Sequence, residues 1–402
     1  MRILFAVHGY KPAYRVGGPI VSVSALAEHL VARGHQVIVF ATNSNLDLDL
    51  DVPTDKPIDV NGVEVWYFRR DDFIQRRLPF LGYLAKSIGF LYAPLMRREL
   101  DRVVPTVDIV HTHMPFVYPT YAASRAAFRH GKPLFYHQRG VFDPKRLGFR
   151  ARKKRAYIRL FELPVLRRAT TLVALTTAEV TSYRALGVDT QCEVIPNGID
   201  ADRYRSVPIH DVEARWHIPP EAEVVLFMGR IHPSKGADRL VDAFLSIAQR
   251  IPSAVLVMAG PDEFGLEQKM RDRVEQSGFA SRVIFTGMVS GDDKLDLLAR
   301  ANLFCLPSDG EGFSIAILEA LASCTPVLIS PDCHFPEVQE AGAGVIASTD
   351  PAALATALAA LLERPQVLRE MGDRGCALVR EGYGWDRITD LTIKAYMRAL
   401  RA

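Results

Sequence analysis

Two glutamates separated by seven residues, Glu311 and Glu319, lie in and after a glycine-rich segment of the C-terminal half. A short apolar run, Leu303 to Leu306, precedes this segment, and an apolar helix-forming stretch follows it. When a strand passes through such a loop into a helix, the unpaired backbone N–H groups at the start of the helix can bind phosphate. A carboxylate inside an apolar helix needs hydrogen-bond donors, which for Glu319 could be ribose hydroxyls. Alternatively, Glu311 only interacts with the helix dipole and Glu319 is an exposed charge.

A second loop with glycines at both ends carries two basic residues. The apolar run Val224 to Met228 is followed by Gly229-Arg230-Ile231-His232-Pro233-Ser234-Lys235-Gly236. A guanidinium can bind two phosphate oxygens at once, and the lysine ammonium adds a more mobile charge. Together they would offset the charge of a diphosphate. The alternative is a solvated basic loop without a ligand.

In the N-terminal half, polar residues follow two expected strands. His111 and His113 lie at the end of the run that begins at Ile109, and Arg139 follows Leu134 to His137. Open parallel sheets bind ligands at the carboxyl ends of their strands, so we expect His113 and Arg139 to face a ligand. We expect His111 to be structural, and a packing role remains the alternative for His113.

The elements that would position these residues alternate between short apolar runs and longer helical patterns, which is typical of βαβ units and a parallel sheet. We expect strands at 3–7, 36–42, 63–68, 109–112, 134–137, 171–174, 192–195, 224–228, 254–259, 283–286, 303–306, 326–329 and 344–346. We expect helices at 20–33, 80–103, 119–129, 150–167 and 177–185, in the intervals of the second half, and in a last pair at 351–362 and 386–400. The turn formers from Pro196 to Asp200 mark a domain boundary.

Composition is that of an ordinary globular protein. The chain has 402 residues, 49% hydrophobic and 24% charged residues and a net charge of +3, which suits two domains with separate cores. An apolar stretch long enough to span a bilayer is not found, and the N-terminal run lacks a cleavage site. The five cysteines have no CxxC spacing, which argues against a disulfide framework and a zinc site and suits a reducing cytoplasm.

The spacing Glu311-x7-Glu319, with Pro307-Ser308 before it and Pro326-Val327 after it, resembles the signature of the family 4 retaining glycosyltransferases of GT-B fold. The resemblance covers nearly the whole chain, because Gly17-Gly18, Gly34-His35 and the two loops described above occur in the expected order. Ser314 and Cys324 depart from it, since the family usually has glycine at both positions. The resemblance implies an α/β fold of two doubly wound, Rossmann-like domains that face each other across a cleft.

The family also implies roles for individual residues. Arg230 and Lys235 would hold the donor diphosphate, Glu319 the ribose and Glu311 the transferred sugar. Gly18 would let its loop close on the phosphates, and His113 would bind a hydroxyl of the sugar. The segment from Arg139 to Pro144 resembles a segment of polysaccharide-assembling members, which implies that Arg139 contacts the acceptor or a phosphate. The expected donor-binding residues are Gly17, Gly18, Arg230, Lys235, Gly260, Met288, Val289, Glu311, Gly312, Phe313, Ser314, Ile315 and Glu319.

We therefore expect an acceptor-binding domain at 1–196, a nucleotide-sugar domain at 197–380 and a helix at 381–402 that returns to the first domain. The expected reaction is retaining transfer of a hexose-type sugar from a UDP- or GDP-sugar to a glycan or lipid-linked acceptor. His113, Arg230, Lys235 and Glu311 would be catalytic, without a metal or cofactor. A sugar-nucleotide epimerase, a phosphorylase and a non-catalytic binding protein are alternatives. A nicotinamide dehydrogenase is disfavoured because no G-x-G-x-x-G follows either first strand.

Positive charge is concentrated between Arg139 and Arg168, where eleven Arg or Lys accompany only Asp143 and Glu162. Apolar residues are interleaved from Leu147 to Phe161. A basic amphipathic helix can bind an anionic membrane surface, so we expect Lys145 to Arg168 to hold the protein at the inner face of the cell membrane, near a lipid-linked acceptor. A solvated helix face is the alternative, and nucleic-acid recognition motifs are not found.

Overall fold

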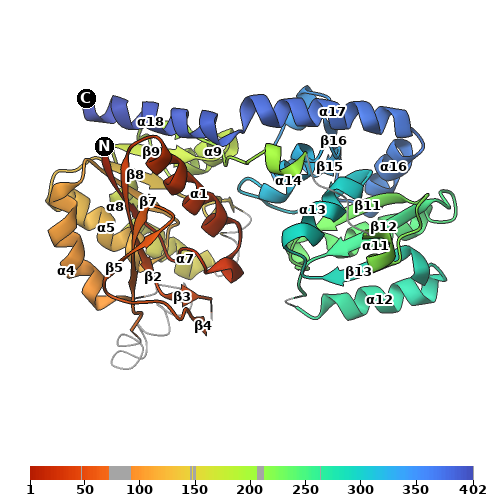
Figure 1. The fold of residues 1–402 in the computed structure, drawn as a ribbon, viewed down its shortest axis with the longest axis horizontal. Coiled ribbons are helices and arrows are strands. Elements are labelled where there is room, and N and C mark those ends of the chain that lie inside the picture. Colours follow the sequence, from red (N-terminus) through yellow and green to blue (C-terminus); the bar gives the residue numbers. More distant parts are fainter. Residues whose placement is uncertain are drawn as a thin grey trace. The chain divides into compact units, whose positions relative to one another are not determined.

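The computed structural model describes residues 1–402 except 47, 72–91, 145–146, 148–150, 206–211, 263 and 402. Part of the expected helix at 80–103, and Lys145, Arg146 and Arg150 of the basic segment, therefore lie outside the described residues. The chain forms two compact units (Figure 1). Unit 1 comprises Met1–Gly198 with Trp385–Ala402, and unit 2 comprises Ile199–Gly384.

Unit 1 is built on a sheet with the strand order β10-β9-β8-β7-β1-β2-β6-β5. All neighbouring strands are parallel except the edge pair β5 and β6. The strands are β1 (Arg2–Ala6), β2 (Gln36–Thr42), β5 (Pro57–Val60), β6 (Val63–Phe68), β7 (Ile109–His113), β8 (Leu134–His137), β9 (Thr171–Ala174) and β10 (Cys192–Val194), with a separate short pair β3 (Ser44–Asn45) and β4 (Leu48–Asp49). The order reverses between β1 and β7, which makes this a doubly wound sheet.

The two faces of this sheet carry separate apolar clusters. One includes residues of α1 (Gly18–Ala32) and α18 (Trp385–Arg401), so the last helix of the chain is part of the unit 1 core. The other α-helices in the described part of unit 1 are α4 (Pro94–Val103), α5 (Tyr118–Arg129), α7 (Ala151–Tyr157), α8 (Leu163–Leu166) and α9 (Thr177–Ala185). The single helix expected at 150–167 is interrupted by a π-helical segment, Ile158–Glu162.

Unit 2 has six parallel strands in the order β13-β12-β11-β14-β15-β16. They are β11 (Glu223–Met228), β12 (Ala254–Ala259), β13 (Val283–Gly287), β14 (Leu303–Leu306), β15 (Val327–Ile329) and β16 (Gly344–Ile346). The order reverses between β11 and β14. Doubly wound sheets bind ligands at such a reversal, beyond the carboxyl ends of the strands.

The helices of unit 2 are α10 (Val212–Trp216), α11 (Ala237–Ile247), α12 (Leu266–Ser277), α13 (Gly291–Arg300), α14 (Ile315–Ala322), α15 (Glu337–Glu340), α16 (Pro351–Leu362) and α17 (Pro365–Gly382). Sequence reasoning missed α17, whose glycines lower helix propensity. The glycines serve close packing instead. A Cβ at Gly372 would lie 2.1 Å from the Cys324 carbonyl oxygen, and one at Gly375 would lie 2.8 Å from Leu321.

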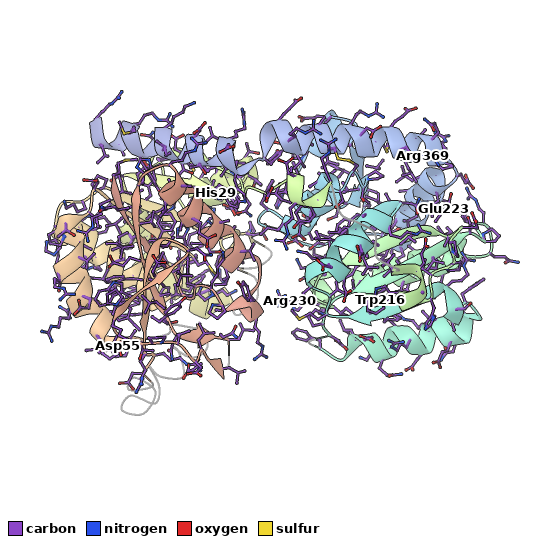
Figure 2. The ribbon with its side chains drawn as sticks, viewed as in Figure 1. His29, Asp55, Trp216, Glu223, Arg230 and Arg369 are labelled. Carbon is purple, nitrogen blue, oxygen red and sulfur yellow. A yellow bond between two sulfur atoms is a disulfide. The ribbon has the colours of Figure 1, made fainter. Side chains whose placement is uncertain are left out.

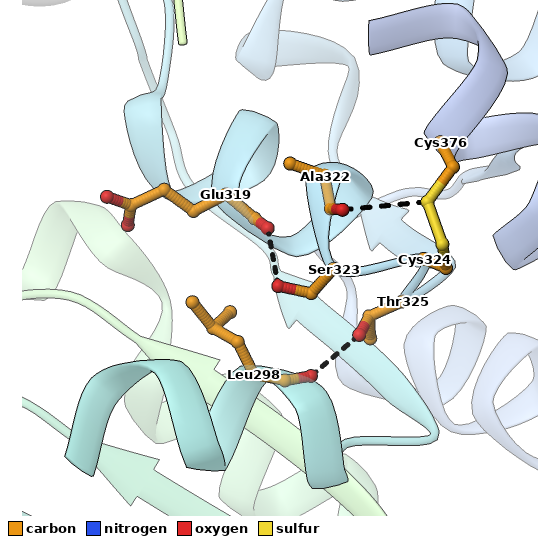
Figure 3. Close-up of a disulfide and its surroundings, with 7 residues drawn as sticks. All are labelled: Leu298, Glu319, Ala322, Ser323, Cys324, Thr325 and Cys376. Atoms are coloured by element: carbon orange, nitrogen blue, oxygen red, sulfur yellow. Dashed lines mark hydrogen bonds between the residues drawn. A yellow bond between two sulfur atoms is a disulfide. The ribbon is translucent and has the colours of Figure 1, made fainter. Parts of the chain in front are cut away.

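The same contact contains a disulfide between Cys324 and Cys376 (Figure 3). The expectation drawn from cysteine number and spacing was therefore wrong for this pair. Their Cα atoms lie 5.0 Å apart, within the range that a disulfide spans, because α17 packs against the end of α14. Cys192, Cys305 and Cys333 are free. Among the described helices, none is long and apolar enough to cross a membrane.

Candidate functional site

The loops after β11 and β14 are joined where the strand order of unit 2 reverses. Asp309 N donates to the Ser234 carbonyl oxygen over 2.8 Å, and the Ser308 hydroxyl donates to the same oxygen over 3.0 Å. Gly236 has a φ of 69°, and a Cβ there would lie 2.2 Å from the Pro307 carbonyl oxygen. Only glycine therefore fits at this position.

This junction brings together two of the residues singled out from sequence. The Lys235 ammonium forms an ion pair with Oε1 of Glu311, although the residues are 76 positions apart. Glu311 is 7% exposed, and its backbone N–H donates to the Asp332 backbone carbonyl oxygen over 2.9 Å. Arg230, in the same loop as Lys235, is exposed (Figure 2). A cation and a carboxylate are thus in contact. A phosphate could bind the cation in place of the carboxylate, and a sugar hydroxyl could bind the carboxylate in place of the cation.

The start of α14 lies beside these loops in sequence and supplies backbone donors. Ser314 is the N-cap residue of α14, and its hydroxyl makes no capping hydrogen bond with the described residues. Phe313 packs on Phe335 and Tyr383, with ring centroids 4.9 Å and 5.5 Å away. These contacts hold the segment from Gly312 to Ile315 in place, and its helix start can accept an anion.

Close packing of glycines gathers the ends of β11, β12 and β13. A Cβ at Gly260 would lie 1.8 Å from the Gly229 carbonyl oxygen, and Gly260 N donates to Gly287 over 2.7 Å. Met288 follows directly and is 70% exposed, while Val289 is half-buried. Gly260, Met288 and Val289 therefore lie along the strand ends next to the Arg230 loop, as a binding surface for a base would require.

Glu319 has two partners that sequence reasoning did not find. The Tyr204 hydroxyl donates to its Oε1 over 2.9 Å, and the Lys294 ammonium contacts the same oxygen at 2.6 Å. Glu319 is 7% exposed, so the alternative of an exposed helix charge is wrong. A buried carboxylate requires hydrogen-bond donors, so partners of this kind could be expected from the sequence. The sequence does not indicate which residues they are.

In unit 1, three histidines form a buried cluster. His111 and His113 are two residues apart on β7, so their side chains lie on the same face of the sheet. His113 pairs in register with His137 on β8. His113 is the last residue of β7, rather than just beyond it, and is 1% exposed. Burial lowers the pKa of all three imidazoles well below the ordinary value, so they are neutral at pH 7.

Arg139 adjoins this cluster and is itself buried, in a left-handed backbone conformation. Its guanidinium donates to Ser22 at 2.8 Å, to Asn197 at 2.9 Å and to Nδ1 of His113 at 3.4 Å. Burial lowers its pKa to about 10, so the charge remains at pH 7. A small cavity of about 10 Å³, lined in part by His111, His137 and Arg139, adjoins the charge.

The potential ligand atoms of the three histidines lie within 4.8 Å of one another, a donor set that zinc could use. The adjacent guanidinium opposes a cation there. Its donation to Nδ1 of His113 also places the proton of the neutral ring on Nε2, which then has no lone pair for a metal. Nε2 of His113 and both ring nitrogens of His137 are buried without a partner among the described residues. The cluster favours a hydrogen-bond acceptor over a metal ion.

Gly17 and Gly18 start α1, after the first strand of unit 1. Gly17 is the N-cap of the helix with a φ of 98°, and a Cβ there would meet nothing within 4 Å. Backbone conformation, not crowding, therefore favours glycine at position 17. Gly18 is exposed and is the first residue of the helix.

Two family models match the chain, "Glycosyltransferase Family 4" over residues 16–203 and "Glycosyl transferases group 1" over residues 210–376. The chain belongs to glycosyltransferase family 4. This glycosyltransferase is 27% identical over 400 residues to the D-inositol 3-phosphate glycosyltransferase of Gordonia bronchialis, an alignment that covers 96% of this chain and 85% of the relative. A relative from Saccharomonospora viridis with the same description is 26% identical over 400 residues, covering 96% of this chain and 90% of its own.

Solved structures show the same two-domain GT-B fold. Sucrose-phosphate synthase from Thermosynechococcus elongatus superposes with a TM-score of 0.76 at 21% identity, covering 99% of this glycosyltransferase and 98% of that chain. HepE from Anabaena, in complex with UDP and glucose, superposes with a TM-score of 0.74 at 20% identity, covering 99% of this glycosyltransferase and 100% of that chain. The expected α/β fold of two doubly wound, Rossmann-like domains is confirmed.

Proposed function

We propose that this glycosyltransferase moves a hexose-type sugar from a UDP- or GDP-sugar to a glycan or lipid-linked acceptor, with retention of anomeric configuration. The observation that carries the proposal is the pairing of Lys235 with Glu311 at the strand reversal of unit 2. Support comes from HepE, whose structure contains UDP and glucose. The donor would separate this ion pair, with Lys235 turning to phosphate and Glu311 to sugar hydroxyls.

The donor contacts follow from the arrangement in unit 2. Arg230, Lys235 and the first N–H groups of α14 bind the diphosphate, and Glu319 binds the ribose. Gly260, Met288 and Val289 contact the base, mostly through the backbone. As the glycosidic bond breaks, negative charge grows on the departing nucleoside diphosphate, and these cations and dipoles stabilise it. That stabilisation does not require a metal ion, so we propose metal-independent transfer.

Retention requires attack from the face that the leaving group vacates or a covalent intermediate. We favour front-face attack, since by the family resemblance Glu311 contacts hydroxyls of the sugar rather than its anomeric carbon. The bond from the anomeric carbon to the donor phosphate oxygen breaks, and the bond to the acceptor oxygen forms on the same face. The departing phosphate accepts the proton of the acceptor hydroxyl.

Unit 1 supplies His113 and Arg139 in this proposal. His113 binds a hydroxyl of the transferred sugar, and Arg139 binds a phosphate or other polar group of the acceptor. The hydrogen bonds that the buried Arg139 guanidinium makes among the described residues go to the neutral side chains of Ser22, Asn197 and His113, which supports an anionic acceptor group. The name of the Gordonia relative indicates a phosphorylated acceptor for that protein.

Membrane attachment through the segment Lys145 to Arg168 extends the proposal to a lipid-linked acceptor. Leu160 is 67% and Phe161 40% exposed, next to the exposed Arg155 and Arg159. Each basic side chain near an anionic surface contributes about 1 kcal/mol. In a flotation assay, the protein should bind anionic vesicles at low salt and leave them at high salt. Absence of salt-sensitive binding would rule out this attachment.

The decisive experiment incubates the protein with a panel of UDP- and GDP-sugars and measures thermal shift, then hydrolysis or transfer for any sugar that binds. A true donor should raise the melting temperature in proportion to the logarithm of its concentration. Lys235→Ala should lower kcat by about 100-fold or more, as for other groups that stabilise a developing anion. Lys269→Ala, an exposed position on α12, is the matched control. Binding without any turnover would favour a non-catalytic sugar-nucleotide-binding protein.

A further inference from the structure

Two side chains from different elements of unit 2 meet on one carboxylate oxygen. Tyr204 ends the 3₁₀ turn Asp202–Tyr204, which follows the domain boundary, and Lys294 lies in α13. Both reach Oε1 of Glu319, at 2.9 Å and 2.6 Å. Glu319 and Tyr204 are nearly buried, with 7% and 8% exposure. The position of this carboxylate is therefore set by residues outside its own helix.

The contacts leave the two oxygens of Glu319 unequal. Both donors that the described residues supply fall on Oε1, so Oε2 is the oxygen left for a ligand. Burial and the adjacent carboxylate raise the pKa of Tyr204, so its hydroxyl stays protonated and acts as donor. The Lys294 ammonium offsets the carboxylate charge. Figure 3 shows the Glu319 side chain pointing away from the disulfide, whose Cys324 lies just beyond the C-terminal end of α14.

We propose that Tyr204 and Lys294 are positioning residues that set the preference of this enzyme for a ribose over a deoxyribose in the donor nucleotide. They hold Oε1 so that Oε2 faces the ligand and accepts from a ribose hydroxyl. The inference rests on the proposed role of Glu319 in ribose binding. A fixed acceptor rejects an analogue that lacks the hydroxyl, because the buried carboxylate then keeps an unmet hydrogen bond. A carboxylate that can rotate finds other partners and discriminates less.

The test measures dissociation constants of the full-length protein for UDP and GDP and for their 2′-deoxy counterparts by calorimetry. Whichever of UDP and GDP binds the wild type more tightly is then used, with its 2′-deoxy counterpart, to measure the variants. The wild type should favour the ribonucleotide by about tenfold or more, the usual value of a hydrogen bond to a charged group. Glu319→Gln should reduce that ratio. Tyr204→Phe and Lys294→Met should each bring the ratio toward one, through weaker ribonucleotide binding with little change for the deoxynucleotide.

Two controls separate positioning from general damage. Lys294→Arg keeps the charge and should keep most of the preference, while Lys269→Met makes the same change at an exposed position of α12 and should leave the ratio unchanged. A purely structural role for Tyr204 or Lys294 would weaken both nucleotides by the same factor and overturn the inference. The inference would also be overturned if Tyr204→Phe and Lys294→Met both kept the wild-type ratio of dissociation constants while Glu319→Gln lost the preference. A wild type without any ribose preference would instead overturn the role proposed for Glu319.

Discussion

At the scale of single residues, Gly236 meets two separate requirements. Its φ of 69° disfavours other residues, and a Cβ would lie 2.2 Å from the Pro307 carbonyl oxygen. Gly278, which ends α12 with a φ of 79°, meets only the first, because nothing lies within 4 Å of its Cβ position. Gly236 and Gly278 therefore form a matched pair. Backbone strain would arise at both positions on substitution, but crowding would arise only at Gly236.

We expect Gly278→Ala to lower the free energy of unfolding by about 1 kcal/mol, the usual value for left-handed backbone strain. Gly236→Ala should lower it by at least about 2 kcal/mol, since the loops after β11 and β14 must separate. It should also weaken nucleotide binding, which Gly278→Ala should not. Urea unfolding and calorimetry test both points. Equal effects of the two substitutions would contradict the crowding argument.

Glu162, in the π-helical segment of unit 1, predicts a pH effect. Burial raises its pKa from 4.5 to about 7, despite donation from the Tyr136 hydroxyl and the Phe116 N–H. The folded state therefore binds more protons than the unfolded state between these values. This group accordingly lowers stability as the pH rises from about 4.5 to about 7, by at most roughly 3 kcal/mol.

Glu162→Gln removes this titration while all other groups stay the same. The free energy of unfolding of the variant minus that of the wild type, measured by urea unfolding, should be larger at pH 8 than at pH 5. A difference in stability that does not depend on pH would show that Glu162 keeps an ordinary pKa.

At the scale of elements, the contact between α14 and α17 links the proposed phosphate site to the end of unit 2. The disulfide between Cys324 and Cys376 closes a loop of 52 residues. Chain entropy assigns such a crosslink about 4 kcal/mol, usually an upper value. Cys376→Ser should therefore lower the melting temperature of unit 2 by several degrees.

A dithiol reductant should produce the same loss in the wild type and no further loss in Cys376→Ser, when both are followed by calorimetric melting. Cys192→Ser, which changes a free cysteine of unit 1, serves as the control and should keep the response to reductant. A wild-type melting curve that is insensitive to reductant would contradict a stabilising disulfide.

At the scale of the whole molecule, the two units differ in the number of chain segments that form them. Unit 2 is one continuous segment, whereas unit 1 needs α18 from the far end. Trp385, Ile388 and Tyr396 belong to its core, and the Tyr396 hydroxyl lies 2.6 Å from Nδ1 of His111. Ion pairs of Arg33 with Asp386 and Asp390 are largely exposed and add little.

A chain that ends at Gly384 should therefore leave an apolar face of unit 1 uncovered. We expect it to bind a hydrophobic dye, to lose the melting transition of unit 1 and to retain nucleotide binding in unit 2. Addition of a peptide with residues 385–402 should reverse the dye binding. Normal melting of unit 1 without α18 would contradict this dependence.

Much of the fold could be predicted from the sequence because its signals are local. Apolar runs of strand length, such as Ala254 to Ala259, coincide with the observed strands, since a strand buried on both faces needs continuous apolar residues. Lys235 stands next to Gly236, which the loop geometry requires, and Glu311 stands between two glycines, so the sequence alone marked both residues as candidates. The helix α17 was missed because Gly372 and Gly375 serve its packing rather than its propensity.

The sequence by itself determined most of the strands and helices in their order, because apolar runs and turn formers are local signals. Its motifs, spread from Gly17 to Val327, determined the family and the chemical types of the proposed site residues. Tertiary structure alone decided that Cys324 meets Cys376, that Tyr204 and Lys294 share one oxygen of Glu319, and that Arg139 is buried beside three neutral histidines. These contacts join residues far apart in the chain. Their distances depend on how whole elements pack, which residue types and spacing do not encode.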